Sequence, residues 1–303
     1  MSEKIKITFL GTGSAIPPND RFQVSTALRH KHGLILFDCG EGTQYLIRKY
    51  SISIKKEILI CISHLHSDHF LGLPGLLASL QLLHYSGNVT ILGPIYTRQV
   101  VSNLLKSAFV TPDFPLDFVE IGQDEVFHGK GFTISAIDAV HEAKALSYIW
   151  KEDDKPGKIN MKKLETMGVT AGPLVGQIQQ GKSITVNGTE IFPTDIIGEK
   201  RKGRIVVYSG DTAPNQNLAL NLREGCDLLI HEATYPSSME ELANERDHST
   251  FRQAASIALF GRVKTLYLTH ISPRVKEVEN ELLDAREIFQ NTFVAVDGHE
   301  FIL

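Results

Sequence analysis

Short apolar runs rich in β-branched residues alternate along the chain with stretches of helical periodicity. The runs end abruptly at polar or glycine residues and predict strands over Ile5–Leu10, Leu34–Phe37, Ile58–Ile62, Phe132–Ile137, Ile205–Tyr208, Leu228–Ile230 and Leu266–Leu268. The helical patterns lie between them, at Gly42–Tyr50, Leu76–Tyr85, Tyr96–Ala108, Thr250–Phe260 and Val278–Phe289. This mixture predicts an α/β protein with buried strands and outer helices.

Residues 151–204 differ from the rest of the chain in composition, because they are polar and basic with dispersed glycine and proline. The segment holds ten of the 31 Lys and Arg residues and only seven of the 35 Asp and Glu residues. We expect an inserted basic arm that protrudes from the body and contains a helix over Ile159–Met167. Long insertions of this kind are usually functional, although a plain surface loop is the alternative.

Length and composition limit the class of protein. The chain has 303 residues, a net charge of −4 and three widely spaced cysteines, which make neither a disulfide framework nor a zinc knuckle. The longest apolar stretch, Phe70 to Leu83, is interrupted by polar residues, glycine and proline, and the N-terminus carries no cleavage-site pattern. We therefore expect a cytoplasmic protein without a membrane partner, folded as a single domain over 1–303 with the arm inserted.

The strongest chemical signal is the hexapeptide HLHSDH, which directly follows the predicted strand Ile58–Ile62. It places four candidate metal ligands, His64, His66, Asp68 and His69, within six residues. Imidazole and carboxylate together suit zinc and related divalent ions. Ligands this dense close on one ion only with strain, so two adjacent ions are favoured.

Two ions require further ligands, and the ends of later predicted strands provide them. His141, Asp211 and His270 each lie just beyond an apolar run. Functional groups of α/β proteins gather at the carboxyl ends of strands. Each of these residues alone would be weak support, but together they complete a set for two ions.

These motifs resemble those of the metallo-β-lactamase superfamily, and within it the ribonuclease Z family of tRNA 3′-processing endonucleases. FLGTGSAIP, FDCGEGTQ, SHLHSDH with GLPGLL, SGDT, HEATY, the triplet His248-Ser249-Thr250 and LTHIS match in order over nearly the whole chain. The resemblance implies a four-layer αββα sandwich. It also implies an endoribonuclease that cuts precursor tRNA after the discriminator nucleotide, leaving a tRNA 3′-hydroxyl and a trailer 5′-phosphate.

The resemblance also assigns ligands. It implies two Zn²⁺ ions per chain, with Mn²⁺ or Co²⁺ as substitutes. His64, His66 and His141 would hold one ion, Asp68, His69 and His270 the other, and Asp211 would bridge both. The family's proton-acceptor role falls on Asp68.

A ribose 3′-oxygen is a poor leaving group unless it is protonated. His248 is the candidate general acid, since a positioned imidazole donates protons near neutral pH. Glu232, in HEAT, is the candidate partner that orients it. The alternative for His248 is a structural place beside the N-cap of the following helix, which Ser249 or Thr250 would start.

Substrate contacts are implied at two places. The family's tRNA-gripping exosite matches AGPLVGQIQQGKSI in the arm, with Gly172, Pro173, Gly176 and Lys182, and its lysines would meet phosphates. In the family, a homodimer lets the arm of one subunit hold the tRNA that the other cleaves. Arg21 is a further candidate phosphate contact, although Phe22 departs from the Arg-Asn pair that the family often carries there.

Two other functions stay open at this stage. The same metal motif serves small-molecule phosphodiesterases and hydrolases of thioesters or lactones, so only the arm and His248-Ser249-Thr250 favour RNA. A non-catalytic RNA-binding scaffold with a vestigial site is the second alternative. A degenerate relative of that kind would be expected to lose ligands, and this sequence retains all seven.

Overall fold

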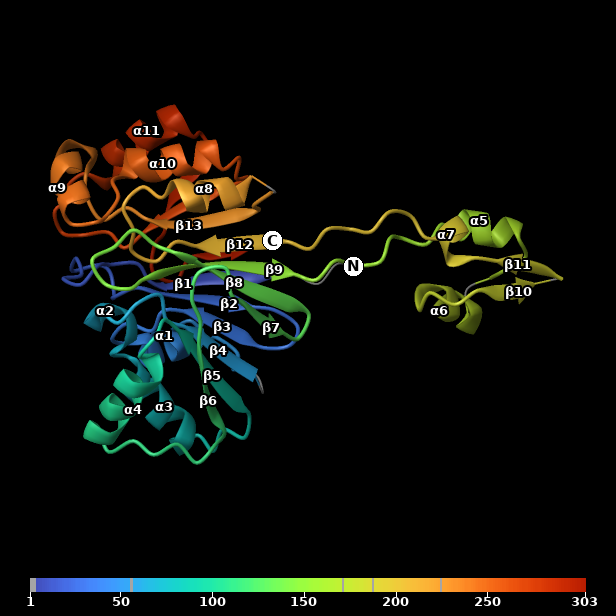
Figure 1. The fold of residues 1–303 in the computed structure, drawn as a ribbon, viewed down its shortest axis with the longest axis horizontal. Coiled ribbons are helices and arrows are strands. Elements are labelled where there is room, and N and C mark those ends of the chain that lie inside the picture. Colours follow the sequence, from blue (N-terminus) through green and yellow to red (C-terminus); the bar gives the residue numbers. More distant parts are fainter. Residues whose placement is uncertain (1–3, 55–56, 171, 187, 224) are drawn as a thin grey trace. The chain divides into compact units, whose positions relative to one another are not determined.

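The apolar runs of the sequence form the inner strands of two β-sheets in the computed structural model of the chain (Figure 1). The structure describes residues 4–54, 57–170, 172–186, 188–223 and 225–303. The chain divides into two compact units, one made of Met1–Lys151 with Ile205–Leu303 and the other of Glu152–Arg204.

The first sheet of the larger unit has the strand order β16-β1-β2-β3-β4-β5-β6. Its strands are β1 (Lys6–Gly11), β2 (Ser25–Arg29), β3 (Leu34–Phe37), β4 (Glu57–Cys61), β5 (Asn88–Gly93), β6 (Leu116–Glu120) and β16 (Glu300–Ile302). The strands from β3 to β6 run parallel to one another, so their carboxyl ends lie at one edge.

The second sheet has the order β15-β14-β13-β12-β9-β8-β7. Its strands are β7 (Val126–Gly129), β8 (Phe132–Asp138), β9 (Leu146–Glu152), β12 (Ile205–Tyr208), β13 (Leu228–Glu232), β14 (Leu266–Thr269) and β15 (Thr292–Val294). The strands from β12 to β15 are parallel, whereas β9 pairs antiparallel with β12.

Helices cover the outer face of each sheet (Figure 1). On the first sheet these are α1 (Thr43–Lys49), α2 (Ser67–Phe70), α3 (Leu73–Leu82) and α4 (Thr97–Ser107). On the second they are α8 (Gln216–Leu222), η1 (Ser237–Met239), α9 (Glu240–Glu245), α10 (Phe251–Phe260) and α11 (Val278–Ile288).

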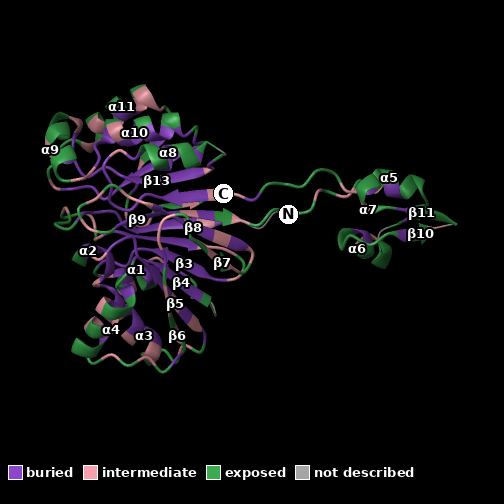
Figure 2. Cartoon of the chain, viewed as in Figure 1, coloured by how far each residue is buried: buried purple, intermediate pink, exposed green. Residues whose placement is uncertain are grey.

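Three apolar clusters hold these layers together (Figure 2). The central one lies between the sheets and includes Phe9, Phe37 and Trp150, all fully buried. The other two lie between each sheet and its helices. Burial of apolar side chains in all three clusters provides most of the stabilisation of the fold. The predicted α/β class and αββα sandwich are confirmed.

Each predicted strand and helix lies on an observed element, with shifted ends in several cases. The largest shift is at α3, predicted over Leu76–Tyr85 and observed over Leu73–Leu82. Pro74 lies in the first turn of this helix, where its missing N–H costs nothing, so the helix begins before the proline rather than after it.

The smaller unit has its own apolar core. It contains α5 (Met161–Thr166), α6 (Pro173–Gln179), the hairpin of β10 (Ile184–Val186) with β11 (Thr189–Ile191), and α7 (Pro193–Ile196). Six buried side chains form its centre: Leu164, Val169, Ile178, Ile184, Ile191 and Ile196. The helix predicted at Ile159–Met167 corresponds to α5, whereas α6, α7 and the hairpin were not predicted. Among the described residues, no helix is long and apolar enough to span a membrane.

Candidate metal centre and active site

The HLHSDH residues begin at the carboxyl end of β4. His64 and His66 lie in the loop after this strand, and Asp68 and His69 lie in the short helix α2. His64, Asp68 and His69 are buried, whereas His66 is exposed. A four-residue helix that starts immediately after the loop therefore turns Asp68 and His69 back toward His64.

The second sheet contributes its residues from the carboxyl ends of three strands. His141 follows β8, Asp211 follows β12 and His270 follows β14. His270 has a φ of 59°, a left-handed conformation that non-glycine residues seldom adopt and that is often found at functional sites. The predicted set from both sheets therefore meets at one edge of the sandwich.

The Asp211 carboxylate lies at the centre of this set. Its Oδ2 is 3.2 Å from His69 Nε2, 3.5 Å from His270 Nε2 and 3.8 Å from His64 Nε2. Asp68 Oδ2 lies 3.2 Å from His270 Nε2 and 3.4 Å from His69 Nε2. Two carboxylates thus alternate with three imidazoles, which is the donor chemistry of a site for divalent cations.

Overlapping groups of donor atoms come close enough to hold metal ions. They are His64 with His66 and His141; His64 with His69 and Asp211; Asp68 with His69 and His270; and Asp211 with His248 and His270, each within 4.8 Å. Within the described ranges, His64 Nε2 and His69 Nε2 are buried without a hydrogen-bond partner. Buried polar atoms seldom stay unpaired, so these two nitrogens fit the role of metal ligands.

Asp38, which the sequence analysis did not single out, lies directly behind these ligands. It follows β3 with a φ of 57° and is fully buried. Its Oδ2 accepts hydrogen bonds from His69 Nδ1 at 2.6 Å, Tyr208 Oη at 2.7 Å and Ser63 Oγ at 2.9 Å. The signal was present in FDCGEG, where an acidic residue ends an apolar run in the manner of the predicted ligands.

His248 reaches the same edge from the turn before α10 and contacts Glu232, the last residue of β13. His248 Nδ1 donates to Glu232 Oε1 at 2.8 Å. Burial lowers the pKa of His248, but the charge of Glu232 and this hydrogen bond outweigh it and raise the pKa to about 9. The contact with Glu232 therefore favours the protonated form of the ring, in which it can donate a proton.

One alternative gave His248 a structural place beside the N-cap of α10. Thr250 is that N-cap, as the alternative assumed, and it forms a capping box with Gln253. Burial raises the pKa of the Glu232 carboxyl, but the nearby His248 and its hydrogen bond lower it overall. Glu232 thus remains an acceptor for the imidazole.

Comparison with known proteins agrees with this geometry. The chain is 39% identical over 302 residues to a ribonuclease Z of Bacillus licheniformis, with 98% of each sequence covered. The solved structure of human tRNase Z, short form, matches with a TM-score of 0.68 at 25% identity over 98% of both chains.

The chain belongs to the ribonuclease Z family. It is therefore an endoribonuclease of the tRNA 3′-processing class, and its histidine and aspartate clusters indicate a divalent metal site. The metallo-β-lactamase fold protein YhfI of Bacillus subtilis matches with a TM-score of 0.71 at 16% identity over 100% of both chains, which supports the fold. A family model described as anti-Pycsar protein Apyc1 also matches, over residues 5–150.

Arg21, the candidate phosphate contact, uses part of its guanidinium for hydrogen bonds within the larger unit. Its Nη1 donates to Thr12 Oγ1 and to the Ala295 carbonyl, each at 2.6 Å. Thr12 in turn donates to Asp297 at 2.7 Å. Any contact with RNA would use the remaining part of the guanidinium, so its substrate role stays a prediction.

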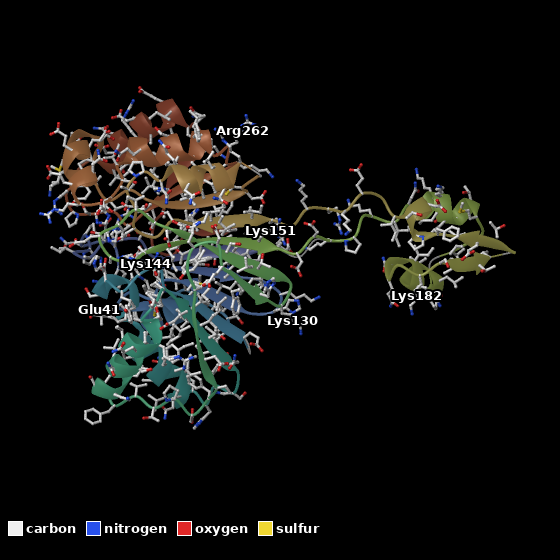
Figure 3. All side chains as sticks on the ribbon, in the orientation of Figure 1. Glu41, Lys130, Lys144, Lys151, Lys182 and Arg262 are labelled. Carbon is white, nitrogen blue, oxygen red and sulfur yellow. The ribbon has the colours of Figure 1, made fainter. Side chains whose placement is uncertain are left out.

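The candidate exosite residues of the arm lie around α6. Gly172 is its N-cap, Pro173 and Gly176 lie within it, and Lys182 is exposed between α6 and β10 (Figure 3). A Cβ added at Gly172 or Gly176 would meet no atom of the described residues within 4 Å, so packing against these residues does not require glycine at either position. Ala171, the first residue of the predicted stretch, lies outside the described residues.

Proposed function

We propose that this chain removes the 3′ trailer from precursor tRNA in the cytoplasm with two Zn²⁺ ions per chain. It would cut after the discriminator nucleotide and leave a tRNA 3′-hydroxyl and a trailer 5′-phosphate. The observation that carries the proposal is the convergence of seven metal-ligand candidates with the His248–Glu232 pair at one edge of a ribonuclease Z fold.

The proposed ligand assignment follows the groups of neighbouring donors. His64, His66 and His141 would hold one ion, Asp68, His69 and His270 the second, and Asp211 both. His141 Nδ1 donates to the Asp247 carbonyl at 3.1 Å, which leaves Nε2 facing His66 Nδ1 at 3.3 Å. Bound divalent cations lower the pKa of water and stabilise charge on phosphoryl oxygens.

The protein side chains would carry the proton transfers. Asp68 would accept a proton from the attacking water, the role that the family resemblance implies for this position, and its carboxylate lies between His69 and His270. The oxygen of that water would then bond to phosphorus as the bond between phosphorus and the ribose 3′-oxygen breaks. His248 would donate a proton to that oxygen from Nε2, since its Nδ1 is occupied by Glu232.

The test is cleavage of a 3′-extended precursor tRNA, with the cut mapped to the nucleotide and a chelator control. A single chelator-sensitive cut next to the discriminator is the expected result. No cut, with hydrolysis of a small phosphodiester intact, would instead favour a small-molecule phosphodiesterase of the same fold.

The basic arm is the proposed exosite for the tRNA body. In the proposed homodimer, the arm of one subunit holds the tRNA that the other subunit cleaves. Glu152 pairs with Arg204 at 2.8 Å and with Lys155 at 2.6 Å, which neutralises part of the charge. Lys162, Lys182 and Lys200 are exposed and suit contacts with phosphates. The unpacked glycines of α6 leave room for close approach of an RNA backbone.

Deleting the arm is expected to separate tRNA cleavage from the phosphodiester chemistry. Lys151 of β9 pairs with Ile205 of β12, so an Asn-Gly turn can replace residues 152–204 and close a hairpin. We expect kcat/KM for precursor tRNA to fall about a hundredfold, because several phosphate contacts are lost. Hydrolysis of a small phosphodiester should persist.

Mixing the arm-deleted chain with a full-length Asp211→Ala chain extends this experiment to the dimer. Recovery of tRNA cleavage on mixing is expected when an arm on one subunit serves the intact site of the other. Equal loss or equal persistence of both activities in the arm-deleted chain would count against the exosite.

A further inference from the structure

Two buried carboxylates stand behind the histidines of the site, one from each sheet. Asp38 follows β3 and Glu232 ends β13, and both are at most 1% exposed. Each accepts a hydrogen bond directly from one imidazole, His69 Nδ1 for Asp38 and His248 Nδ1 for Glu232. The two sheets thus provide the same arrangement twice.

Each carboxylate also accepts a hydrogen bond from the hydroxyl of a serine or a threonine. Ser63 Oγ donates to Asp38 Oδ2 at 2.9 Å, and Thr234 Oγ1 donates to Glu232 Oε2 at 2.6 Å. An ionised carboxylate only accepts, so the single proton of each hydroxyl is committed to it. The remaining lone pairs of these hydroxyl oxygens can then only accept.

A second histidine lies against each of these hydroxyl oxygens. His64 Nδ1 is 3.0 Å from Ser63 Oγ, and His270 Nδ1 is 2.8 Å from Thr234 Oγ1. Because the hydroxyls have no further proton to give, Nδ1 of each ring must carry the hydrogen. The lone pair of a neutral His64 or His270 ring is therefore on Nε2, the nitrogen that faces Asp211 in both cases.

We propose that Ser63 and Thr234 are positioning residues that fix the tautomers of His64 and His270 as metal ligands. Each hydroxyl donates its hydrogen to a buried carboxylate and therefore accepts a hydrogen bond from a second histidine, which the carboxylate does not contact. One carboxylate thereby orients two rings: Asp38 serves His69 and His64, and Glu232 serves His248 and His270. This inference rests on the proposed metal function of the site.

Loss of the Ser63 hydroxyl and loss of the Thr234 hydroxyl should weaken metal binding at different positions. Ser63 contacts His64, which belongs to the group with His66 and His141. Thr234 contacts His270, which belongs to the group with Asp68 and His69. Without the hydroxyl, the ring is free to place its hydrogen on Nε2, where it would oppose a cation. Loss of such an outer partner usually lowers metal affinity about 10- to 100-fold.

The first test is Thr234→Val, which removes the hydroxyl and keeps the shape. A Zn²⁺ titration against a chromophoric chelator is expected to show about 10- to 100-fold weaker binding at one position, and Thr234→Ser should restore it. Ser63→Ala should weaken the other position. The matched control is Thr26→Val on β2, since Thr26 Oγ1 is buried, has no hydrogen-bond partner among the described residues and is outside the site.

The second readout is the histidine ¹⁵N spectrum of the metal-free full-length protein. In the wild type, His270 Nδ1 should carry a hydrogen, and in Thr234→Val a population without a hydrogen on Nδ1 should appear. Unchanged Zn²⁺ affinity together with an unchanged tautomer in both variants would overturn the proposal. Neither readout uses RNA, so a wild-type protein that binds Zn²⁺ but cuts no tRNA would refute the proposed function alone.

Discussion

Replacing Asp211 by alanine is expected to remove metal from both positions and to abolish cleavage. The Asp211 carboxylate lies within 4 Å of nitrogens of His64, His69, His270 and His248. Its loss leaves the two histidine groups without the negative charge between them. Activity on precursor tRNA should fall by more than about a thousandfold, because the charge stabilisation and water activation that cations supply are lost together.

The measurement is metal content per chain after dialysis, by elemental analysis, beside the cleavage rate. Asp138→Ala is a matched control, because Asp138 also ends a strand of the second sheet but pairs with the exposed Lys144 at 2.7 Å. That control should keep both its metal and its rate. An Asp211→Ala protein that retained two ions per chain would show that the proposed ligand assignment is wrong.

Much of the fold followed from the sequence because the central strands are continuous apolar runs. The parallel strands β4, β12, β13 and β14 are largely buried, so each contains an apolar run, of Ile, Leu and Val in the first three and Leu-Tyr-Leu in β14. The carboxyl ends of such strands gather at one edge, which is why residues as distant as His64 and His270 could be expected to meet.

Other strands carried no comparable signal. β2 consists of Ser25–Arg29 and owes its place to pairing with β1 and β3, not to its own composition. β9 includes Ser147 and Lys151 beside Trp150, and its burial comes from the opposite sheet. Such strands depend on tertiary contacts that are distant in the sequence.

The residues behind the ligands were missed for a related reason. Ser63 and Thr234 are ordinary hydroxyl residues whose importance lies in distances to Asp38 and Glu232, and no spacing in the sequence encodes these distances. The Glu232–His248 pairing was suggested by family motifs, and the contact itself is a property of the fold. Sequence thus indicates ligand types, and folding determines which nitrogen faces the site.

Replacing His248 by alanine is expected to slow cleavage about 10²- to 10⁴-fold while leaving metal content intact, the usual share of general acid catalysis. His248 contacts Glu232 at 2.8 Å and lies 4.0 Å from Asp211, at the margin of the ligand set. The measurement is single-turnover cleavage of precursor tRNA, with metal content determined on the same sample. His128→Ala, at an exposed position on β7, is the control and should keep the wild-type rate.

The leaving group distinguishes a general acid from a residue that merely supports the site. A nitrophenyl phosphodiester releases a phenolate that needs little protonation, so His248→Ala should hydrolyse it at close to the wild-type rate. The ribose 3′-oxygen of tRNA needs the proton, so the rate loss of His248→Ala should be confined to precursor tRNA. Equal losses on both substrates would contradict the acid role and assign His248 to the structure of the metal site.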